Sequence, residues 1–235
     1  MPIPFFYIAE YNTSQKEIML DEDTSKHIVQ VLRMKEGEKI NLADGNGNLI
    51  TAEITQAHKK HCQVKNSNTR FTPQGSRKIS IAIYLLKNTN RFEWFLEKAT
   101  EIGVSEIVPI ICERTEKEKF RFERMNQICI SAMLQSQQCW LPKLHEPVLY
   151  NKIIEESYHD LKIIAHCSET EKKGIHELSK ENFSSGIILI GPEGDFSDKE
   201  IRSAIQHHFV AASLGHTRLR SETAGIVAAT FLCGN

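Results

Sequence analysis

Short apolar runs alternate with segments of helical periodicity over the second half of the chain. The runs are rich in β-branched residues, as expected of strands covered on both faces. They are Ile79–Leu86, Ile107–Ile111, Leu161–Cys167, Gly186–Ile190 and Val210–Leu214. The intervening helical segments are Arg91–Ile102, Phe122–Gln138, a segment that starts after Ser197, and Ala224–Leu232. Because strands and helices alternate, the pattern predicts an α/β fold with a mainly parallel sheet.

The helix expected over Arg91–Ile102 places Phe92, Phe95, Leu96 and Ala99 on one face. Gly103 is suited to end it, because glycine adopts the left-handed conformation at a helix C-terminus. An aromatic stripe at this spacing favours core packing over a surface on which nucleic-acid bases would stack.

The first part of the chain has a different pattern, with short strand-like runs and tight turns. The runs are Phe5–Ile8, Lys39–Ala43, Leu49–Ile54 and a segment that begins at Cys62. Asp44-Gly45-Asn46-Gly47 contains two overlapping hairpin-turn dipeptides. Thr24 is a candidate cap for a short helix. Several short strands with tight turns predict a small β-barrel.

A polar segment, Asn66–Lys78, separates the two parts and is predicted to be a linker because it contains Pro73 and Gly75. We therefore expect two domains, residues 1–72 and residues 73–235.

Two glycine-bearing turns late in the chain carry the candidate chemistry. The first, Gly191–Gly194, precedes Ser197-Asp198-Lys199-Glu200, which matches a capping box. Glycine permits positive φ and lets a ligand approach the backbone closely, and a strand–turn–helix connection is where open α/β sheets bind ligands. A tight connection without a ligand explains this first turn equally well.

The second turn, from Leu214 to Thr223, brings Arg218, Arg220 and Glu222 together before an apolar helix. Charges this dense between buried elements need partners. This favours a ligand over a solvated loop.

GPEGDFSDKE followed by LGHTRLRSETA closely resembles the paired signatures of the 16S rRNA (uracil-N3)-methyltransferases, the ribosomal RNA small subunit methyltransferase E family of the SPOUT superfamily. Upstream, Lys87, the block Glu97–Val104 and the segment His27–Arg33 resemble further motifs of that family. Asp195 stands where the family usually has a second glycine, and Arg218 where it usually has isoleucine. Many members also have an arginine in the opening residues, and none lies between Pro2 and Ala9.

The resemblance implies a PUA-like or OB-like RNA-binding β-barrel followed by a SPOUT methyltransferase domain with a carboxy-terminal trefoil knot. The knot follows from the resemblance alone, since the usual rules of chain threading would count against it. The family also implies a homodimer formed through the knotted domain, with the active site completed at the subunit interface.

The implied reaction moves a methyl group from S-adenosylmethionine to N3 of a specific uridine in the 16S rRNA of the 30S subunit. The uracil imide must lose its N3 proton, so Glu222 is the candidate base, Glu193 the alternative, and Arg220 the candidate for stabilising the imidate. Arg220 and Glu222 could instead pair with each other or cap the last helix. The cofactor-binding candidates are Leu189, Gly191, Pro192, Glu193, Gly194, Leu214, Gly215, Leu219 and Arg220.

Because the N3 edge of uracil is occupied in a duplex, the target must be unpaired or flipped out. The candidate phosphate contacts are Arg33, Lys35, Arg91 and Arg114, and an ordinary surface role fits each of them at least as well. Arg33 and Lys35 also suit a helix C-terminus, where cations are favourable. The net charge of −1 argues against nonspecific coating of nucleic acid but not against a local basic face.

Other classes are disfavoured by what the sequence lacks. No apolar run is long enough for a membrane span, and the first residues do not match a signal peptide. The six cysteines are scattered without a C-x-x-C pair, so neither a metal site nor a disulfide framework is predicted, and we expect a cytoplasmic protein with reduced thiols. Two rival functions remain: an RNA-binding protein without activity, and a SPOUT enzyme that methylates another position, such as a ribose 2′-hydroxyl.

Overall fold

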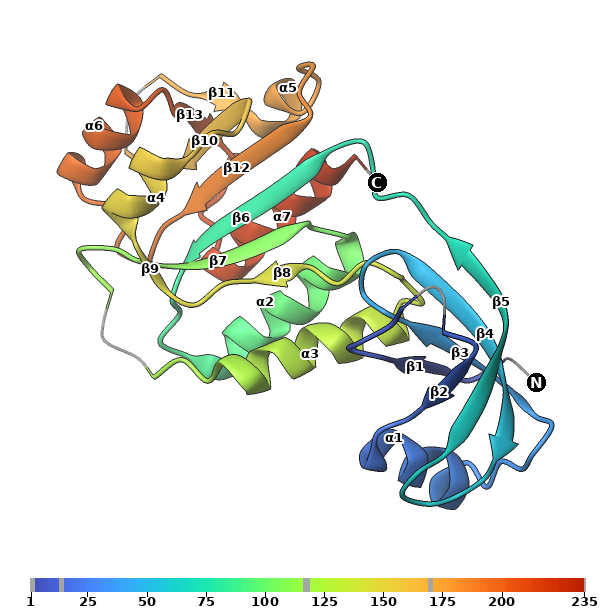
Figure 1. Cartoon of the computed structure of the whole chain (residues 1–235). Helices are drawn as coiled ribbons and strands as arrows, with labels where there is room; N and C mark the ends of the chain where they lie inside the picture. The colour runs from blue at the N-terminus through green and yellow to red at the C-terminus, as the bar shows by residue number, and fades with distance from the viewer. Residues whose placement is uncertain (1–2, 13–14, 116–118, 169–170, 235) are drawn as a thin grey trace. The chain divides into compact units, whose positions relative to one another are not determined.

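The computed structural model describes residues 3–12, 15–115, 119–168 and 171–234, which form two compact units. The first unit comprises Met1–Gln74 and Met133–Leu141, and the second comprises Gly75–Ala132 and Pro142–Asn235. Figure 1 shows the elements of each unit along the chain.

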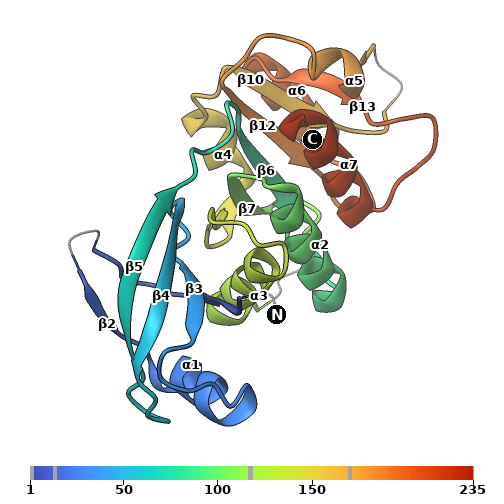
Figure 2. The same ribbon diagram turned by 90° about the vertical axis from the view of Figure 1, so that its right-hand side faces the viewer.

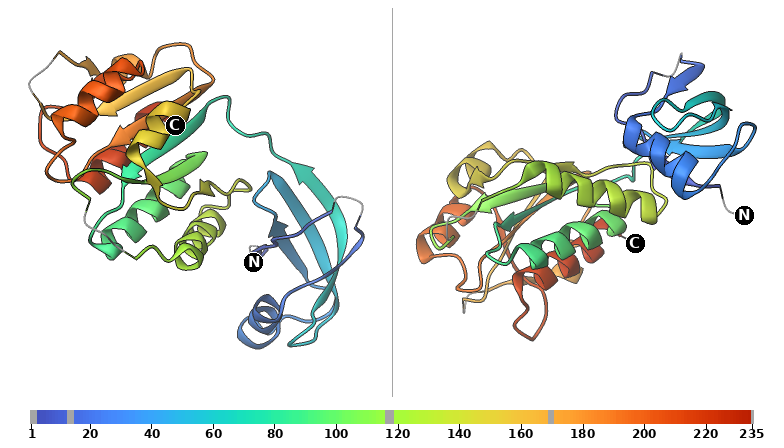
Figure 3. Two further views of the ribbon diagram at one scale, coloured as in Figure 1. Left: turned by 60° about the vertical axis from the view of Figure 1, so that its left-hand side comes forward. Right: turned by 90° about the horizontal axis from the view of Figure 1, so that it is seen from below.

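The first unit is built on a five-stranded sheet with the order β1-β3-β4-β5-β2. The β1–β3 pair is parallel and the other pairs are antiparallel. Irregular register between β4 and β5 helps the sheet to curl around one apolar core (Figure 3). The elements are β1 (Phe5–Tyr7), β2 (Glu17–Met19), α1 (Glu22–Lys26), a π-helical turn (His27–Val31), β3 (Lys39–Ala43), β4 (Asn48–Gln56) and β5 (Gln63–Phe71).

Two expectations for this unit are wrong in detail. The cap of α1 is Asp21 rather than Thr24, because an Asp21 side-chain oxygen accepts a hydrogen bond from the Thr24 backbone nitrogen at 2.9 Å. The polar segment Asn66–Lys78 is a linker only in its middle, since β5 continues to Phe71 and β6 begins at Lys78. The far half of β5 is exposed, so polar side chains face solvent while the backbone pairs with β4.

The second unit contains an eight-stranded sheet with the order β11-β13-β10-β12-β6-β7-β8, and β9 pairs with β7. Every pairing between its named strands is parallel, which confirms the predicted α/β class. The strands are β6 (Lys78–Tyr84), β7 (Glu106–Ile111), β8 (Lys143–Leu144), β9 (Val148–Leu149), β10 (Leu161–Ala165), β11 (Lys173–Gly174), β12 (Ser185–Ile190) and β13 (Val210–Ser213). The helices are α2 (Thr89–Ile102), α3 (Phe122–Gln135, of which Phe122–Ala132 belongs to this unit), α4 (Tyr150–Glu156), α5 (Ile175–Leu178), α6 (Asp198–Gln206) and α7 (Ser221–Cys233).

The chain leaves neighbouring strands β6 and β12 in opposite directions. The connection from β6 through α2 leads to β7 on one side, whereas the connection from β12 through α6 leads to β13 on the other. Figure 2 shows α2 and α4 on opposite sides of β6 and β7. Such a reversal of strand order opens a crevice at the carboxyl ends of the strands, where α/β sheets bind ligands.

Helix α2 is fixed by its ends and by its buried face. The Asn88 side chain caps its first turn, and Gly103 ends it with a φ of 93°, as the sequence predicted. Phe92 and Phe95 are buried, which confirms that the aromatic stripe is core. Helix α7 packs on α2, β6 and β12. Gly225 permits this close approach, because a Cβ there would lie 2.6 Å from the Phe95 ring.

The remaining boundaries differ by a few residues from the sequence pattern. Helix α3 ends at Gln135 rather than Gln138, and β10 ends at Ala165 rather than Cys167. The short elements β8, β9, α4, β11 and α5 have between 2 and 7 residues each, too few to show a clear periodicity, and the sequence did not predict them.

Candidate functional site

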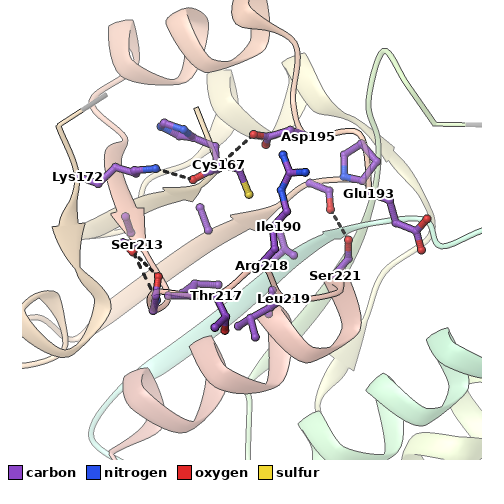
Figure 4. Close-up of a pocket in the computed structure, with 18 of the residues that line it drawn as sticks. Cys167, Lys172, Ile190, Glu193, Asp195, Ser213, Thr217, Arg218, Leu219 and Ser221 are labelled. Atoms are coloured by element: carbon purple, nitrogen blue, oxygen red, sulfur yellow. Dashed lines mark hydrogen bonds between the residues drawn. The ribbon is translucent and has the colours of Figure 1, made fainter. Parts of the chain in front are cut away.

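A cavity of about 350 Å³ lies where the loops after β10, β12 and β13 meet (Figure 4). Its volume is in the range of small-molecule sites. The residues that line it are Ala165, His166, Cys167, Lys172, Ile190, Gly191, Pro192, Glu193, Asp195, Ala212, Ser213, Leu214, Gly215, His216, Thr217, Arg218, Leu219, Ser221 and Ala224. Both glycine turns singled out in the sequence therefore contribute to one cavity.

The first turn uses its glycine for close packing rather than for positive φ. Neither Gly191 nor Gly194 has positive φ among the described residues, whereas Asp195 does, at 64°. A Cβ on Gly191 would lie 2.9 Å from the buried ring of Phe196. The left-handed conformation falls on the next residue of the motif, which explains why glycine also suits position 195.

Asp195 joins this turn to the loop after β10. One carboxylate oxygen accepts a hydrogen bond from the Cys167 backbone nitrogen at 2.7 Å, and the other accepts from the Phe196 nitrogen at 2.8 Å. The Asp195 nitrogen in turn donates to the Pro192 carbonyl at 2.9 Å. The acidic side chain therefore fixes two walls of the cavity.

Two further contacts hold the same turn. Arg114 donates hydrogen bonds from Nη1 to the carbonyl oxygens of Gly194 and Asp195. Ser221, the first residue of α7, donates from its hydroxyl to the Gly191 carbonyl at 2.7 Å. Arg114, a predicted phosphate contact, thus serves at least in part to anchor the turn.

Helix α6, which follows the turn, begins as the sequence predicted. Ser197 and Glu200 form a reciprocal capping box. Glu200 is buried, and its other carboxylate oxygen accepts a hydrogen bond from the Glu113 nitrogen at 2.8 Å. The cap therefore also ties α6 to the loop after β7.

The second turn is held by Ser213 and opened by glycine. Gly215 has a φ of 143°, a conformation that other residues rarely adopt, and its nitrogen donates to the Ser213 hydroxyl at 3.4 Å. After it, the exposed side chain of Arg218 extends across the cavity toward Asp195 (Figure 4).

A wider hollow of about 640 Å³ lies on the other side of the Gly191–Gly194 turn. It is at the point where strand order reverses, between the segments that follow β6 and β12. The two hollows share Pro192 and Glu193. The residues that line the wider one are Tyr84, Leu85, Leu86, Lys87, Asn88, Arg91, Arg114, Pro192, Glu193 and Gly194.

Arg91 connects the two carboxylates that the sequence proposed as bases. Its Nη1 lies 2.9 Å from Glu193 Oε1, and its Nε lies 3.6 Å from Glu222 Oε1. The Glu193 side chain is 67% exposed, whereas that of Glu222 is 9% exposed. Burial, with Glu193 and Glu222 nearby, raises the pKa of Tyr84, which therefore stays neutral beside this cluster.

Only some of the predicted site residues line the cavity. Gly191, Pro192, Glu193, Leu214, Gly215 and Leu219 line the cavity. Leu189 is buried in β12, Gly194 lines the wider hollow instead, and Arg220 is an exposed residue at the start of α7 that lines neither hollow. Arg33 and Lys35 are exposed in the first unit, where Arg33 follows the π-helical turn with a φ of 55°.

The candidate site residues taken from the sequence did not include Cys167 or Lys172, which line the cavity from the loop after β10. Cys167, Lys172 and Asp195 come together only through the order of strands in the sheet. Among the residues that the structure describes, no group of three or more His, Cys, Asp or Glu side chains is placed to hold a metal ion. No helix in the same ranges is long and apolar enough to cross a bilayer.

Two family models match this chain. Residues 73–233 match the model of an RNA methyltransferase domain, and residues 20–65 match that of an RNA methyltransferase PUA domain. A ribosomal RNA small subunit methyltransferase E from Mesomycoplasma hyopneumoniae is 31% identical over 209 residues, which cover 75% of this chain and 90% of that protein. The chain belongs to the ribosomal RNA small subunit methyltransferase E family.

Solved structures of similar proteins cover nearly the whole chain. A probable rRNA-methyltransferase from Porphyromonas gingivalis is 36% identical, has a TM-score of 0.90 and covers 98% of this chain and 97% of its own. A ribosomal RNA small subunit methyltransferase E from Neisseria gonorrhoeae bound to S-adenosyl methionine is 27% identical, with a TM-score of 0.85 and coverage of 97% and 95%.

The family assignment confirms the main sequence-based expectations. The chain is an S-adenosylmethionine-dependent rRNA methyltransferase with an amino-terminal PUA domain and an α/β methyltransferase domain. The cavity suits this cofactor, since it combines the apolar side chains of Ile190, Leu214 and Leu219 with closely approaching backbone at two turns.

Proposed function

We propose that this methyltransferase modifies N3 of a specific uridine in the 16S rRNA of the small ribosomal subunit. The cofactor would occupy the smaller cavity and the target uracil the wider hollow. The observation that carries this proposal is the shared wall: Pro192 and Glu193 line both hollows, so a methyl donor and an acceptor ring would lie on either side of one turn. Bringing the reacting atoms together in this way supplies much of the rate enhancement in a group transfer.

The cofactor supplies an electrophilic methyl group bonded to a positively charged sulfur. The protein must provide a uracil whose N3 has lost its proton, because the neutral imide is a poor nucleophile. Glu193 is the carboxylate that lines the wider hollow, and in this proposal it accepts the N3 proton as the new N–C bond forms and the S–C bond breaks. The products are S-adenosylhomocysteine and N3-methyluridine.

Arg91 and Glu222 complete the cluster. The Arg91 guanidinium lies beside Glu193, where it stabilises negative charge on the carboxylate or on the uracil imidate. Glu222, the other candidate base, is buried beside the Arg91 Nε and lines neither hollow. We assign Glu222 the role of orienting Arg91.

Arg220 fits a role across a subunit interface. Its side chain is exposed and lines neither hollow of its own chain. We propose a homodimer, formed through a knotted carboxy-terminal domain, in which Arg220 stabilises the uracil imidate in the partner's site. Mixing Arg220→Ala chains with Glu193→Gln chains should restore activity, because some mixed dimers then contain one intact site. No recovery above either parent would exclude this arrangement.

RNA binding involves both parts of the chain in this proposal. Residues 1–72 would form the RNA-binding domain, with Arg33 and Lys35 as phosphate contacts, and residues 73–235 the methyltransferase domain. Arg91 and Arg114 would be weaker phosphate contacts, because Arg91 already pairs with Glu193 and Arg114 already donates hydrogen bonds to the glycine turn. The reaction would take place in the cytoplasm, on RNA in which the target base is unpaired or flipped out.

The reaction can be tested on RNA from a strain that lacks the gene. An N3-methyl group blocks base pairing, so reverse transcriptase should stop at one 16S uridine in parental RNA and read through it in mutant RNA. Purified protein with S-adenosylmethionine should restore the stop on mutant 30S particles or naked 16S rRNA. Transfer to a ribose hydroxyl would leave the base-pairing edge free, and tight RNA binding without any transfer would identify a binding protein.

The role of Glu193 can be tested with the same assay. Glu193→Gln should lower the single-turnover rate by about 100-fold or more, the usual contribution of a general base. Glu177→Gln, an exposed substitution on α5, is the matched control and should leave the rate unchanged. If Glu222→Gln is the slower variant while Glu193→Gln is nearly normal, the assignments of base and orienting residue must be exchanged.

A further inference from the structure

Arg218 is a cation in the cofactor cavity that has no partner within the described chain. It lines the cavity from the loop after β13, its side chain is exposed, and no hydrogen bond or ion pair of its guanidinium occurs among the described residues. An arginine side chain loses considerable rotamer entropy when it is ordered, so a guanidinium directed into a ligand cavity is best explained by an anionic group on the ligand.

Asp195 provides the opposite charge on the facing wall. Its carboxylate is fixed by the backbone nitrogens of Cys167 and Phe196, one on each oxygen. Each carboxylate oxygen can accept a second hydrogen bond. Figure 4 shows the Arg218 side chain pointing toward this carboxylate from the other side of the cavity. Two further charged side chains line the cavity, but both have partners: Glu193 pairs with Arg91, and Lys172 donates hydrogen bonds to the carbonyl oxygens of His166 and Ser168. Arg218 and Asp195 are therefore a basic and an acidic group from different loops that can still bind a charged ligand.

This pair matches one end of the cofactor. The methionine part of S-adenosylmethionine has an α-carboxylate and an α-ammonium group, which are both ionised at neutral pH, whereas its adenine and ribose are uncharged. We propose that Arg218 binds the α-carboxylate of the cofactor and that Asp195 binds its α-ammonium group. Both are positioning residues, because they hold the amino-acid end so that the methyl group faces the wider hollow. The inference relies on the cofactor cavity described above and on no property of the RNA.

An alternative is that Arg218 and Asp195 simply pair with each other and close the loops. In that case each substitution would lower the affinity for every ligand equally, whether or not the ligand has an amino-acid end. The two arrangements are separated by ligands that lack parts of the methionine. 5′-Methylthioadenosine lacks the whole amino-acid end, and decarboxylated S-adenosylmethionine lacks only the carboxylate.

The experiment is calorimetric titration of purified full-length protein without RNA. Arg218→Gln should weaken binding of S-adenosylmethionine and S-adenosylhomocysteine by about tenfold, the effect of losing a charge-assisted hydrogen bond. It should leave the affinity for 5′-methylthioadenosine and for decarboxylated S-adenosylmethionine unchanged. Arg202→Gln, an exposed substitution on α6 that does not line the cavity, is the charge-matched control and should bind all four ligands normally.

Asp195→Asn tests the other half of the proposal. It keeps an oxygen for one of the two backbone nitrogens but removes the charge. It should lower the affinity for S-adenosylmethionine and its decarboxylated form, which both retain the ammonium group, more than the affinity for 5′-methylthioadenosine. The proposal would be wrong if either variant lost as much affinity for 5′-methylthioadenosine as for S-adenosylmethionine. It would also be wrong if either variant bound every ligand as tightly as the parent protein. Thermal unfolding of the ligand-free variants shows whether a loss of affinity comes from a damaged fold.

Failure of this proposal and failure of the uridine-N3 assignment would be separate results. Normal binding by Arg218→Gln would remove Arg218 from the cofactor site and leave the reverse-transcriptase test unaffected. Methylation at another RNA position would change the proposed substrate and leave the calorimetric result unaffected.

Discussion

The Asp195 carboxylate accepts a hydrogen bond from the backbone nitrogen of Cys167 at 2.7 Å. These residues are far apart in sequence, and the contact joins the loop after β10 to the turn after β12. Asp195 adopts a φ of 64°, which is unusual for a residue other than glycine. Its side chain thus compensates for a backbone conformation that glycine would adopt without cost.

The two properties of Asp195 can be separated by substitution. Asp195→Gly and Asp195→Ala both lose the hydrogen bond to Cys167, but only alanine must place a Cβ in the left-handed region. We expect the alanine variant to be less stable than the glycine variant by about 1 kcal/mol. Urea unfolding of the two proteins measures this difference directly. Equal stabilities would mean that the backbone relaxes out of the left-handed conformation when the carboxylate is absent.

Gly191 should be intolerant of any side chain. A Cβ at this position would lie 2.9–3.3 Å from atoms of the Phe196 ring, which is buried. Gly191→Ala should therefore reduce the free energy of unfolding by about 1–3 kcal/mol, as overpacking does elsewhere. Gly75→Ala is the matched control, since no atom lies within 4 Å of its added Cβ. If the two variants unfold at the same urea concentration, the Phe196 ring moves without cost.

Cys167 should be the thiol that reacts first in the folded protein. It is exposed and lines the cofactor cavity, whereas Cys62, Cys112, Cys129 and Cys139 are buried and Cys233 is half-buried. Burial raises the pKa of Cys112 to about 12 and of Cys129 and Cys233 to about 11, so these thiols are protonated at neutral pH. Because the thiolate is the reactive form, iodoacetamide should label Cys167 fastest.

Peptide mass spectrometry after brief labelling checks this prediction. A saturating concentration of S-adenosylmethionine should slow the labelling of Cys167, and Cys167→Ser should remove the fast phase. Labelling that the cofactor does not affect would show that the thiol lies outside the occupied part of the cavity.

Asp160 should contribute to unfolding at low pH. Hydrogen bonds from the Ser184 and Ser185 backbone nitrogens, at 3.0 and 2.9 Å, lower the pKa of its carboxyl below the usual 3.8. A carboxyl group whose pKa is lower in the folded state stabilises the fold above its unfolded-state pKa, and this contribution is lost as the pH falls through the folded-state value. Stability should therefore decline below about pH 4 in the parent protein.

Asp160→Asn should show a shallower decline over the same range, because the amide does not titrate. The midpoint of urea unfolding, measured at several pH values between neutral and strongly acidic, gives both curves. Parallel curves would mean that other carboxyl groups account for the acid sensitivity.

The sequence by itself determined the local elements and the motifs. The β-branched runs, the aromatic face of α2 with Gly103 at its end, and the capping box at Ser197 are visible in the sequence because each depends on neighbours within a few residues. The two glycine turns are visible for the same reason, and the paired signatures that contain them resemble those of the family to which the chain belongs.

Only the tertiary structure decided which charges meet. Arg91 contacts Glu193 and Glu222, Arg114 holds the carbonyls of the glycine turn, and Asp195 reaches Cys167, although nothing in the local sequence connects these residues. The order of parallel strands sets these contacts, because it brings the carboxyl ends of β6, β10, β12 and β13 to one edge of the sheet. Short-range patterns can predict a strand or a turn, but they contain no information on which strands become neighbours.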